Sequence, residues 1–408
     1  MRLAFLTHEP FHPPSGGGSA EAVYLVRELV RRGHEVHLFS PAFPDSESIA
    51  RDFRVRLHLF TAWQMGRYAS FRNFKYLLYP AALKRIVFRA AQSTPFDLLL
   101  SQHTISAVAA GQLRQTLRVP VVMNFLDYLT GFMETWPAWI APRPCVNALK
   151  RYELSLPKRF QADGVLTVSD PLADLFAAAG CPRERILPIY YGYDADLFRP
   201  AETPPVAGPP VIVMHGSFDH HHLGPIATQS LAEVHRQRPD ACFRFVGRQT
   251  SALTRSLAVL GKTIPAARLQ TTGFVPYTEV AGHLRTATVG IVPYEESAGT
   301  HCAFVAKAVE YLGTGLPAVA TPLNNLRRYF ADEPALRFSD FSGPSFAREI
   351  LATLAETPER RRTIGLAASQ RVRARLDWQA ISRRAAEFVE AIHARHLQAT
   401  PRPPKLTG

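Results

Sequence analysis

Residues 1–40 read MRLAFLTHEPFHPPSGGGSAEAVYLVRELVRRGHEVHLFS, and this stretch decides the fold. A short apolar run at Leu3–Leu6 is followed by three glycines, and from Ser19 the apolar residues recur at helical spacing until Gly33. A second apolar run starts at Val36. A strand, a helix and a second strand in this order form the βαβ unit from which parallel sheets are built.

The same alternation continues along the chain. Apolar runs predict further strands at 98–100, 119–123 and 165–168, and then at 211–214, 243–246, 269–272, 289–292 and 318–320. Between these groups, residues 201–210 read AETPPVAGPP, where prolines and missing periodicity indicate a linker. The sequence therefore predicts two doubly wound α/β domains, at 1–200 and 201–377, and a tail at 399–408. Because open parallel sheets bind ligands at the carboxyl ends of their strands, we expect the domains to face a central ligand cleft.

The composition agrees with two globular domains. The 408 residues are too many for one ordinary core, and 47% of them are hydrophobic. No apolar run reaches the ~18 residues that cross a bilayer, and the N-terminal run is too short for a signal peptide, so we expect a cytoplasmic protein. The cysteines are far apart and form no Cys-x-x-Cys pair, which indicates buried thiols rather than a zinc site or a disulfide framework.

The net charge of +13 favours an anionic partner, either nucleic acid, an anionic membrane surface or a phosphorylated substrate. Basic and aromatic residues alternate most clearly between Trp63 and Arg89, with the basic side chains at Arg67, Arg72, Lys75, Lys84, Arg85 and Arg89. This stretch fits a helix lying at an anionic lipid interface on the inner face of the membrane. The favoured alternative for this stretch is a solvated charged face above buried aromatic residues.

Residues 307–317 read KAVEYLGTGLP and form the second informative stretch. Helical spacing places the apolar side chains on one stripe, while Lys307 and Glu310 project together from the opposite side, so we expect Glu310 to face away from the core. Gly313 and Gly315 end this helix before the strand at 318–320. A carboxylate there can accept hydrogen bonds from a ribose diol, and the ammonium can meet a phosphate. The alternative is an ordinary exposed ion pair.

Several motifs, taken in their order along the chain, indicate a family. The 307–317 motif follows Gly273-Phe274-Val275-Pro276 and the apolar segment at 289–294, and the first half of the chain contains Arg32-Gly33-His34-Glu35-Val36 and the segment 189–200. In this order they closely resemble the retaining glycosyltransferases of family GT4, and the resemblance covers nearly the whole chain. It implies the GT-B fold, in which two Rossmann-like domains face each other, and a hexosyltransferase type of activity.

The resemblance also implies roles for individual residues. Glu310 would bind the donor ribose, Lys307 would lie near the diphosphate, and the backbone at Phe274 and Val275 would touch the base. The three glycines Gly16, Gly17 and Gly18 would approach the diphosphate or the donor sugar, because a backbone without Cβ atoms can come close to a ligand. The first domain would bind the acceptor and the second the donor, and a helix at about 378–398 would cross back to the first domain.

The chain departs from the family pattern at two places. Many members carry a second glutamate eight residues before the ribose-binding one, and here that position is Cys302. The loop at 216–224, GSFDHHHLG, lacks the Arg and Lys that commonly neutralise the diphosphate. We expect Gly216 and Ser217 of this loop still to contact the donor. The charge would come from Lys307, Arg248 or a histidine, with Lys307 as the principal phosphate partner.

The histidines 220–222 also raise the question of a metal. Consecutive residues cannot easily aim three imidazoles at one ion, and no carboxylate at ligand spacing is evident around them, so we expect no metal site. For catalysis the candidates are His103 and Asp127, which follow predicted strands of the first domain; each is alternatively a satisfied loop residue. By resemblance, the reaction retains the anomeric configuration, through front-face displacement with the leaving phosphate acting as base.

Three other functions compete with a glycosyltransferase. The sequence disfavours an oxidoreductase, because the glycine stretch lacks the third glycine of Gly-x-Gly-x-x-Gly and no acidic residue ends the second strand. A nucleotide-sugar 2-epimerase shares the GT-B fold and stays open, as does a non-enzymatic basic binding protein. The favoured interpretation is a glycosyltransferase with a nucleotide-sugar donor, a saccharide, lipid-linked or other cell-envelope acceptor, no tightly bound cofactor and no nucleic-acid partner.

Overall fold

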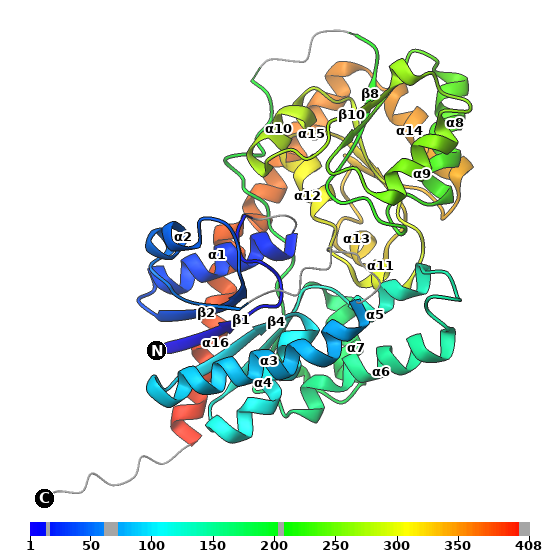
Figure 1. Ribbon diagram of the computed structural model, residues 1–408. Coiled ribbons are helices and arrows are strands. Elements are labelled where there is room, and N and C mark those ends of the chain that lie inside the picture. Colours follow the sequence, from blue (N-terminus) through cyan, green and yellow to red (C-terminus); the bar gives the residue numbers. More distant parts are fainter. Residues whose placement is uncertain (14–16, 61–71, 203–207, 400–408) are drawn as a thin grey trace, which may run out of the picture. The chain divides into compact units, whose positions relative to one another are not determined.

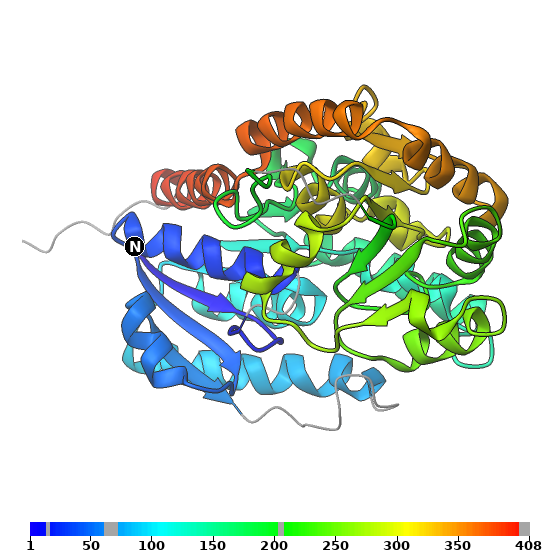
Figure 2. The ribbon, with the colours of Figure 1, turned by 90° about the horizontal axis from the view of Figure 1, so that it is seen from above.

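The computed structural model describes residues 1–13, 17–60, 72–202 and 208–399. The chain divides into two compact units (Figures 1 and 2). The first unit comprises Met1–Asp127, Leu149–Ile189 and Ile381–Gly408, and the second comprises Tyr128–Ala148 and Tyr190–Ala380. Each unit contains one parallel sheet flanked by helices, so the doubly wound α/β class predicted from the sequence is confirmed.

The first unit is built on a seven-stranded sheet in the order β3-β2-β1-β4-β5-β6-β7. Its strands are β1 (Arg2–Leu6), β2 (Glu35–Pro41), β3 (Arg56–Phe60), β4 (Leu98–Gln102), β5 (Val121–Phe125), β6 (Gly164–Thr167) and β7 (Ile186–Pro188). Its helices are α1 (Gly17–Arg31), α2 (Ser46–Phe53), α3 (Arg72–Ser93), α4 (His103–Leu117) and α7 (Asp170–Ala178), with a 3-10 turn at Arg183–Arg185. The strand order reverses between β1 and β4, where such sheets form their binding crevice.

The second unit is built on a six-stranded sheet in the order β10-β9-β8-β11-β12-β13. Its strands are β8 (Val211–His215), β9 (Cys242–Val246), β10 (Leu269–Thr271), β11 (Val289–Val292), β12 (Ala318–Ala320) and β13 (Leu336–Phe338). Its helices are α8 (Pro225–Gln237), α9 (Ser251–Leu260), α10 (Tyr277–Arg285), α11 (Ala298–Cys302), α12 (Ala306–Gly313), α13 (Asn324–Tyr329), α14 (Gly343–Ala355) and α15 (Pro358–Leu376), with a 3-10 turn at Ala266–Arg268. Here the order reverses between β8 and β11.

Central strands form where the sequence offers a continuous apolar run, because both faces of a parallel sheet are covered by helices. Leu98, Leu99 and Leu100 of β4, for example, are fully buried. Each predicted strand is present, with ends shifted by a few residues at most. Three strands that the sequence did not predict, β3, β7 and β13, all lie at sheet edges, where one side of the strand has no neighbour and the run is short or half-exposed.

Two segments pack away from their neighbours in sequence. The C-terminal part of α16 (Trp378–Ala399) packs on the first unit, where Glu390 forms a bidentate ion pair with Arg32, and Gly164 leaves room for Phe388. Residues 128–148 instead group with the second unit and include α5 (Leu129–Phe132), a 3-10 turn (Met133–Thr135) and the start of α6 (Arg143–Arg159). The Glu134 carboxylate accepts a 2.7 Å hydrogen bond from the Ala298 N–H.

Other predictions from the sequence have mixed outcomes. Among the described residues, no helix has both the length and the apolar character needed to cross a membrane. All four cysteines are free, but Cys145 is exposed on α6 rather than buried, because it lies on the solvent side of that helix. Of the basic and aromatic stretch at 63–89, residues 61–71 lie outside the described part, and the side chains are described only from Tyr79 onward. Tyr79 is buried and Phe88 is exposed.

Candidate active site

Glu310 lies on α12, at the reversal of strand order in the second unit. Its side chain is only 6% exposed, so the expectation that it faces away from the core is wrong. One carboxylate oxygen lies 2.5 Å from Nε2 of His215, and the other accepts a 2.9 Å hydrogen bond from the Tyr277 hydroxyl. These polar partners offset the cost of burying the carboxylate. Each oxygen keeps a second lone pair for a ligand.

His215 ends β8 and was not among the residues singled out from the sequence. Its backbone N–H donates to the Tyr311 hydroxyl at 3.3 Å, and its ring meets that tyrosine edge-on at 5.0 Å. Gly290 makes room for this tyrosine, since a Cβ there would lie 2.5 Å from the Tyr311 ring. The available signal was a polar residue ending an apolar strand directly before Gly216. Strand β8 and helix α12 are thus joined through a histidine–glutamate pair.

Lys307 is the buried cation of this site, with 8% of its surface exposed. Its Nζ donates a 2.9 Å hydrogen bond to the hydroxyl of Tyr294, which is a neutral partner. Burial lowers the pKa of Lys307 to about 8, although the carboxylates of Glu310 and Asp219 act in the opposite direction. An ammonium held in this way is stabilised by any anion that reaches it.

The loop after β8 lies beside this lysine. Gly216 has φ +95°, and a Cβ there would lie 3.2 Å from Cε of Lys307. Ser217 is exposed next to it. Position 247 also requires a glycine, since φ is +151° and a Cβ would collide with the Gly216 carbonyl. The loop therefore presents backbone and a hydroxyl, with little side-chain bulk, next to the ammonium.

The exposed ring of Phe274 and the guanidinium of Arg248 lie just after the neighbouring strands β10 and β9. Phe274 is 55% exposed, and the Arg248 guanidinium lies over its ring at 4.7 Å from the centroid. Val275 is half-buried beside it. The predicted donor-binding residues of the second unit are thus carried by the ends of adjacent strands and by α12. An exposed ring paired with a guanidinium suits a planar heterocycle.

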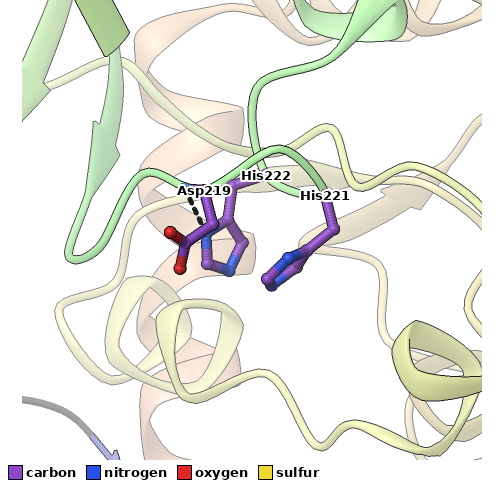
Figure 3. Close-up of side chains that lie close together, drawn as sticks. All are labelled: Asp219, His221 and His222. Carbon is purple, nitrogen blue, oxygen red and sulfur yellow. Dashed lines mark hydrogen bonds between the residues drawn. The ribbon is translucent and has the colours of Figure 1, made fainter. Parts of the chain in front are cut away.

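Asp219, His221 and His222 are the described residues closest to a metal-binding arrangement, with potential ligand atoms within 4.8 Å of one another (Figure 3). The sequence-based argument that no carboxylate accompanies these histidines is therefore wrong. However, the Asp219 N–H donates to Nδ1 of His222 at 3.1 Å. A neutral imidazole has one lone pair for a metal, and here the backbone occupies it. Burial, His221 and Lys307 also hold the pKa of His222 well below its usual value, so its ring is neutral with a proton on Nε2.

In the first unit, His103 starts α4 at the end of β4. It adopts φ +65°, an uncommon conformation for a non-glycine residue. Neither ring nitrogen has a hydrogen-bond partner within the described part of the chain, and Nε2 lies 4.0 Å from the Glu9 carboxylate. Burial lowers the pKa of His103, so the ring is neutral. A neutral, unsatisfied imidazole at a strand end is available to a ligand hydroxyl.

Asp127 follows β5 and is half-buried. Burial raises its pKa to about 8, and the negative charges of Glu9 and Glu153 add to this effect. Glu153 is buried and accepts a 2.5 Å hydrogen bond from the Thr104 hydroxyl. Because burial disfavours the charged form and the nearby carboxylates repel it, Asp127 holds its proton at neutral pH and can donate a hydrogen bond. Sequence reasoning missed both glutamates, which come from other parts of the chain.

The glycines at the start of α1 are described in part. Gly16 lies outside the described residues, whereas Gly17 and Gly18 form the first turn of α1. Farther along this helix, buried Glu21 accepts 3.1 Å hydrogen bonds from the side-chain amides of Gln102 and Asn124. Burial raises the pKa of Glu21 to about 7. These bonds tie α1 to the ends of β4 and β5, the strands that precede His103 and Asp127.

Comparison with known proteins gives matches over most of the chain. The family model described as Glycosyltransferase Family 4 matches residues 15–197, and the model described as Glycosyl transferases group 1 matches residues 209–356. No curated protein sequence gives a significant match.

Solved structures share the fold at low sequence identity. Sucrose-phosphate synthase from Thermosynechococcus elongatus is 16% identical, with 97% of this chain and 99% of that chain covered and a TM-score of 0.79. HepE from Anabaena, solved with UDP-glucose, is 18% identical, with 96% and 100% covered and a TM-score of 0.73. A putative UDP-N-acetylglucosamine 2-epimerase from Listeria monocytogenes is 12% identical, with 100% and 99% covered and a TM-score of 0.60.

Proposed function

The chain belongs to the GT4-type glycosyltransferases of the GT-B fold, and on this premise we propose that it is a retaining hexosyltransferase acting on a cell-envelope acceptor. Its donor is a nucleoside-diphosphate sugar, and its acceptor is a saccharide or a lipid-linked saccharide. The observation that supports the donor best is the buried Glu310 beside the buried Lys307. A carboxylate for a diol and an ammonium for a phosphate lie three residues apart on one helix.

The proposed donor site follows the strand ends of the second unit. The base stacks near Phe274 and Arg248, the ribose hydroxyls donate to Glu310, and the diphosphate lies between Lys307 and the Gly216–Ser217 backbone. The Nε2–H of neutral His222 is a second donor close to Lys307, and takes part of the role of the missing Arg and Lys. UDP-glucose is the first donor to test, because HepE has been solved with it. Because Cys302 stands in place of the usual second glutamate, the identity of the transferred hexose is not assigned.

Sugar transfer passes through an oxocarbenium-like transition state with a departing diphosphate. Lys307 stabilises the negative charge that develops on the leaving phosphate. The acceptor hydroxyl loses its proton to that phosphate on the same face of the sugar, which retains the anomeric configuration. Neutral His103 and protonated Asp127 orient sugar or acceptor hydroxyls by hydrogen bonding. NMR of the product anomer tests this mechanism, and an inverted anomer would contradict it.

The nucleotide is tested first and independently of the acceptor. Thermal shift of the full chain with UDP, GDP and ADP, and then with their sugars, should show stabilisation by one nucleotide series, because ligands that bind only the native state raise the melting temperature. Nucleotide diphosphates should bind more tightly than nucleosides if Lys307 meets the phosphate. The absence of any shift at saturating concentrations would count against the donor site.

Epimerisation of a nucleotide sugar is the second candidate, because the putative 2-epimerase shares the fold over the whole chain. Incubation with the donor alone separates the two functions. A glycosyltransferase leaves the sugar configuration at C2 unchanged, whereas an epimerase converts it without any acceptor. NMR of the recovered nucleotide sugar measures the configuration at C2 and so distinguishes the two functions.

We also propose that transfer needs no bound metal, because the lone pair of His222 is occupied by the Asp219 N–H. Activity should then persist in the presence of a chelator. Loss of activity with EDTA, restored by one particular divalent cation, would instead indicate that the loop rearranges to bind a metal.

A further inference from the structure

The segment before α6 exposes an apolar tip. Trp139 is 83% exposed and Ile140 is 47% exposed. The tip is an ordered turn, since the N–H groups of Ile140 and Ala141 both donate to the Pro137 carbonyl, at 2.9 and 3.0 Å. A tryptophan held this far into solvent by a defined turn is costly in water, so it calls for a partner.

Helix α6, labelled in Figure 1, follows this tip in the sequence and carries further exposed apolar side chains. Cys145, Ala148, Leu149 and Tyr152 are all exposed, and their spacing places them on one stripe of the helix. Leu149 is 41% exposed and Tyr152 is 39% exposed. About a quarter turn away, the adjacent side of the helix holds the buried residues Val146 and Glu153, and the exposed apolar stripe ends before the buried Leu156. The helix is therefore amphipathic, yet part of its exposed side is apolar.

The charges around this stripe have one sign. The basic residues from 136 to 160 are Arg143, Lys150, Arg151, Lys158 and Arg159. The acidic residue in this range, Glu153, is buried. Arg151 and Lys158 are seven residues apart, so both lie on the stripe next to the apolar one. The Arg159 guanidinium lies over the Tyr152 ring at 5.6 Å from the centroid.

We infer that residues 137–159 form a membrane-binding face that lies in the headgroup region of an anionic bilayer. An exposed Trp–Ile tip, an apolar helix stripe and flanking Lys and Arg residues are the composition of interfacial helices. Trp and Tyr favour the membrane–water interface, and basic side chains reach the lipid phosphates. A protein partner or a second copy is less favoured, because the exposed charged side chains of the segment itself are all basic. This proposal does not depend on the enzyme's donor or acceptor.

The test uses the full chain in co-sedimentation with phosphatidylcholine vesicles, with or without phosphatidylglycerol. We expect partitioning to require the anionic lipid and to weaken at high salt. Replacing the tip by Trp139→Ser with Ile140→Ser should lower the partition coefficient by about tenfold or more. Reversing Arg151→Glu with Lys158→Glu should lower it by at least about fivefold for each charge.

Matched controls keep the test specific. Leu366→Ser removes another exposed apolar side chain, and Lys262→Glu with Arg360→Glu changes the net charge by the same amount elsewhere. Both controls should partition like the wild type, and all variants should keep the wild-type UDP thermal shift. The proposal is overturned if the wild type does not bind anionic vesicles, or if tip and control variants bind equally. It is also overturned if the tip substitution abolishes a dimer in solution while vesicle binding is unchanged.

Discussion

Replacing Lys307 by methionine should strengthen the fold and weaken donor binding at the same time. Burial lowers the pKa of Lys307 from 10.5 to about 8. Each pKa unit corresponds to about 1.4 kcal/mol, so the buried ammonium costs the free protein about 3 kcal/mol at neutral pH. Methionine has a similar volume and no charge, so Lys307→Met should recover part of this cost. The loss of the hydrogen bond to Tyr294 subtracts about 1 kcal/mol.

The free-energy cost of burying the Lys307 ammonium also sets the expected loss of UDP affinity. A phosphate next to Lys307 restores the charged form, so binding the diphosphate regains much of the energy that burial costs. We expect UDP affinity in Lys307→Met to fall by about 30- to 100-fold, which corresponds to about 2 to 3 kcal/mol. Titration calorimetry measures the affinity, and urea denaturation measures the stability.

The pH dependence of stability and of UDP affinity tests the role of Lys307 separately. Between about pH 8 and pH 10.5, the unfolded state keeps the lysine proton that the folded state has lost. Unfolding therefore takes up a proton at this group, which becomes less favourable as pH rises, so wild-type stability should rise with pH across this window. UDP affinity should decline above about pH 8. Neither trend should remain in Lys307→Met, and exposed Lys262→Met is the control that should change nothing.

Two outcomes would refute this reasoning. If Lys307→Met loses both stability and affinity, the lysine has a structural role through Tyr294. If it gains stability but binds UDP as the wild type does, the phosphate lies elsewhere on the second unit.

Three further variants test the remaining groups. Glu310→Gln should weaken UDP binding by about tenfold and reduce the affinity for 2′-deoxy-UDP much less, because only the ribose diol needs the carboxylate; an equal loss for both nucleotides would contradict this. Asp127 keeps its proton to about pH 8, whereas an unfolded aspartate releases it near 3.8, so wild-type stability should fall as pH rises between these values and Asp127→Asn should remove that slope, as urea titrations at several pH values can show. His103→Ala should reduce kcat by about 100-fold with little change in UDP binding; a KM effect alone would rule out a role in transfer.

The sequence predicts the sheets better than their edges. Runs such as Leu98–Leu100 are covered by helices on both faces, so their composition alone identifies them. Edge strands such as β3 and β13 are half-exposed or short, and their pairing depends on neighbours distant in sequence. The βαβ units and the two sheets were therefore predictable, whereas the edge strands β3, β7 and β13 were not, and β10 was the one edge strand of the described residues that the sequence predicted.

The candidate active site shows the same limit of prediction from the sequence. The spacing of Lys307 and Glu310 correctly places them together on one helix, but the burial of Glu310 depends on His215 and Tyr277, which lie 95 and 33 residues away. In the same way, the elevated pKa of Asp127 depends on its burial and then on Glu9 and Glu153, which helical or strand periodicity does not connect to it. Local patterns identify the candidate side chains, while long-range contacts set their protonation and exposure.

The grouping of segments into units has a consequence for dividing this protein. A cut in the linker at 201–210 would separate residues 381–399 from the sheet they pack on and residues 128–148 from theirs. The N-terminal piece would expose the apolar surface around Gly164 that Phe388 and Ile392 cover. The C-terminal piece would lose the carboxylate of Glu134 at the start of α11. Neither half therefore carries its complete core, and during synthesis α16 can cover the first sheet only after the whole second unit has been translated.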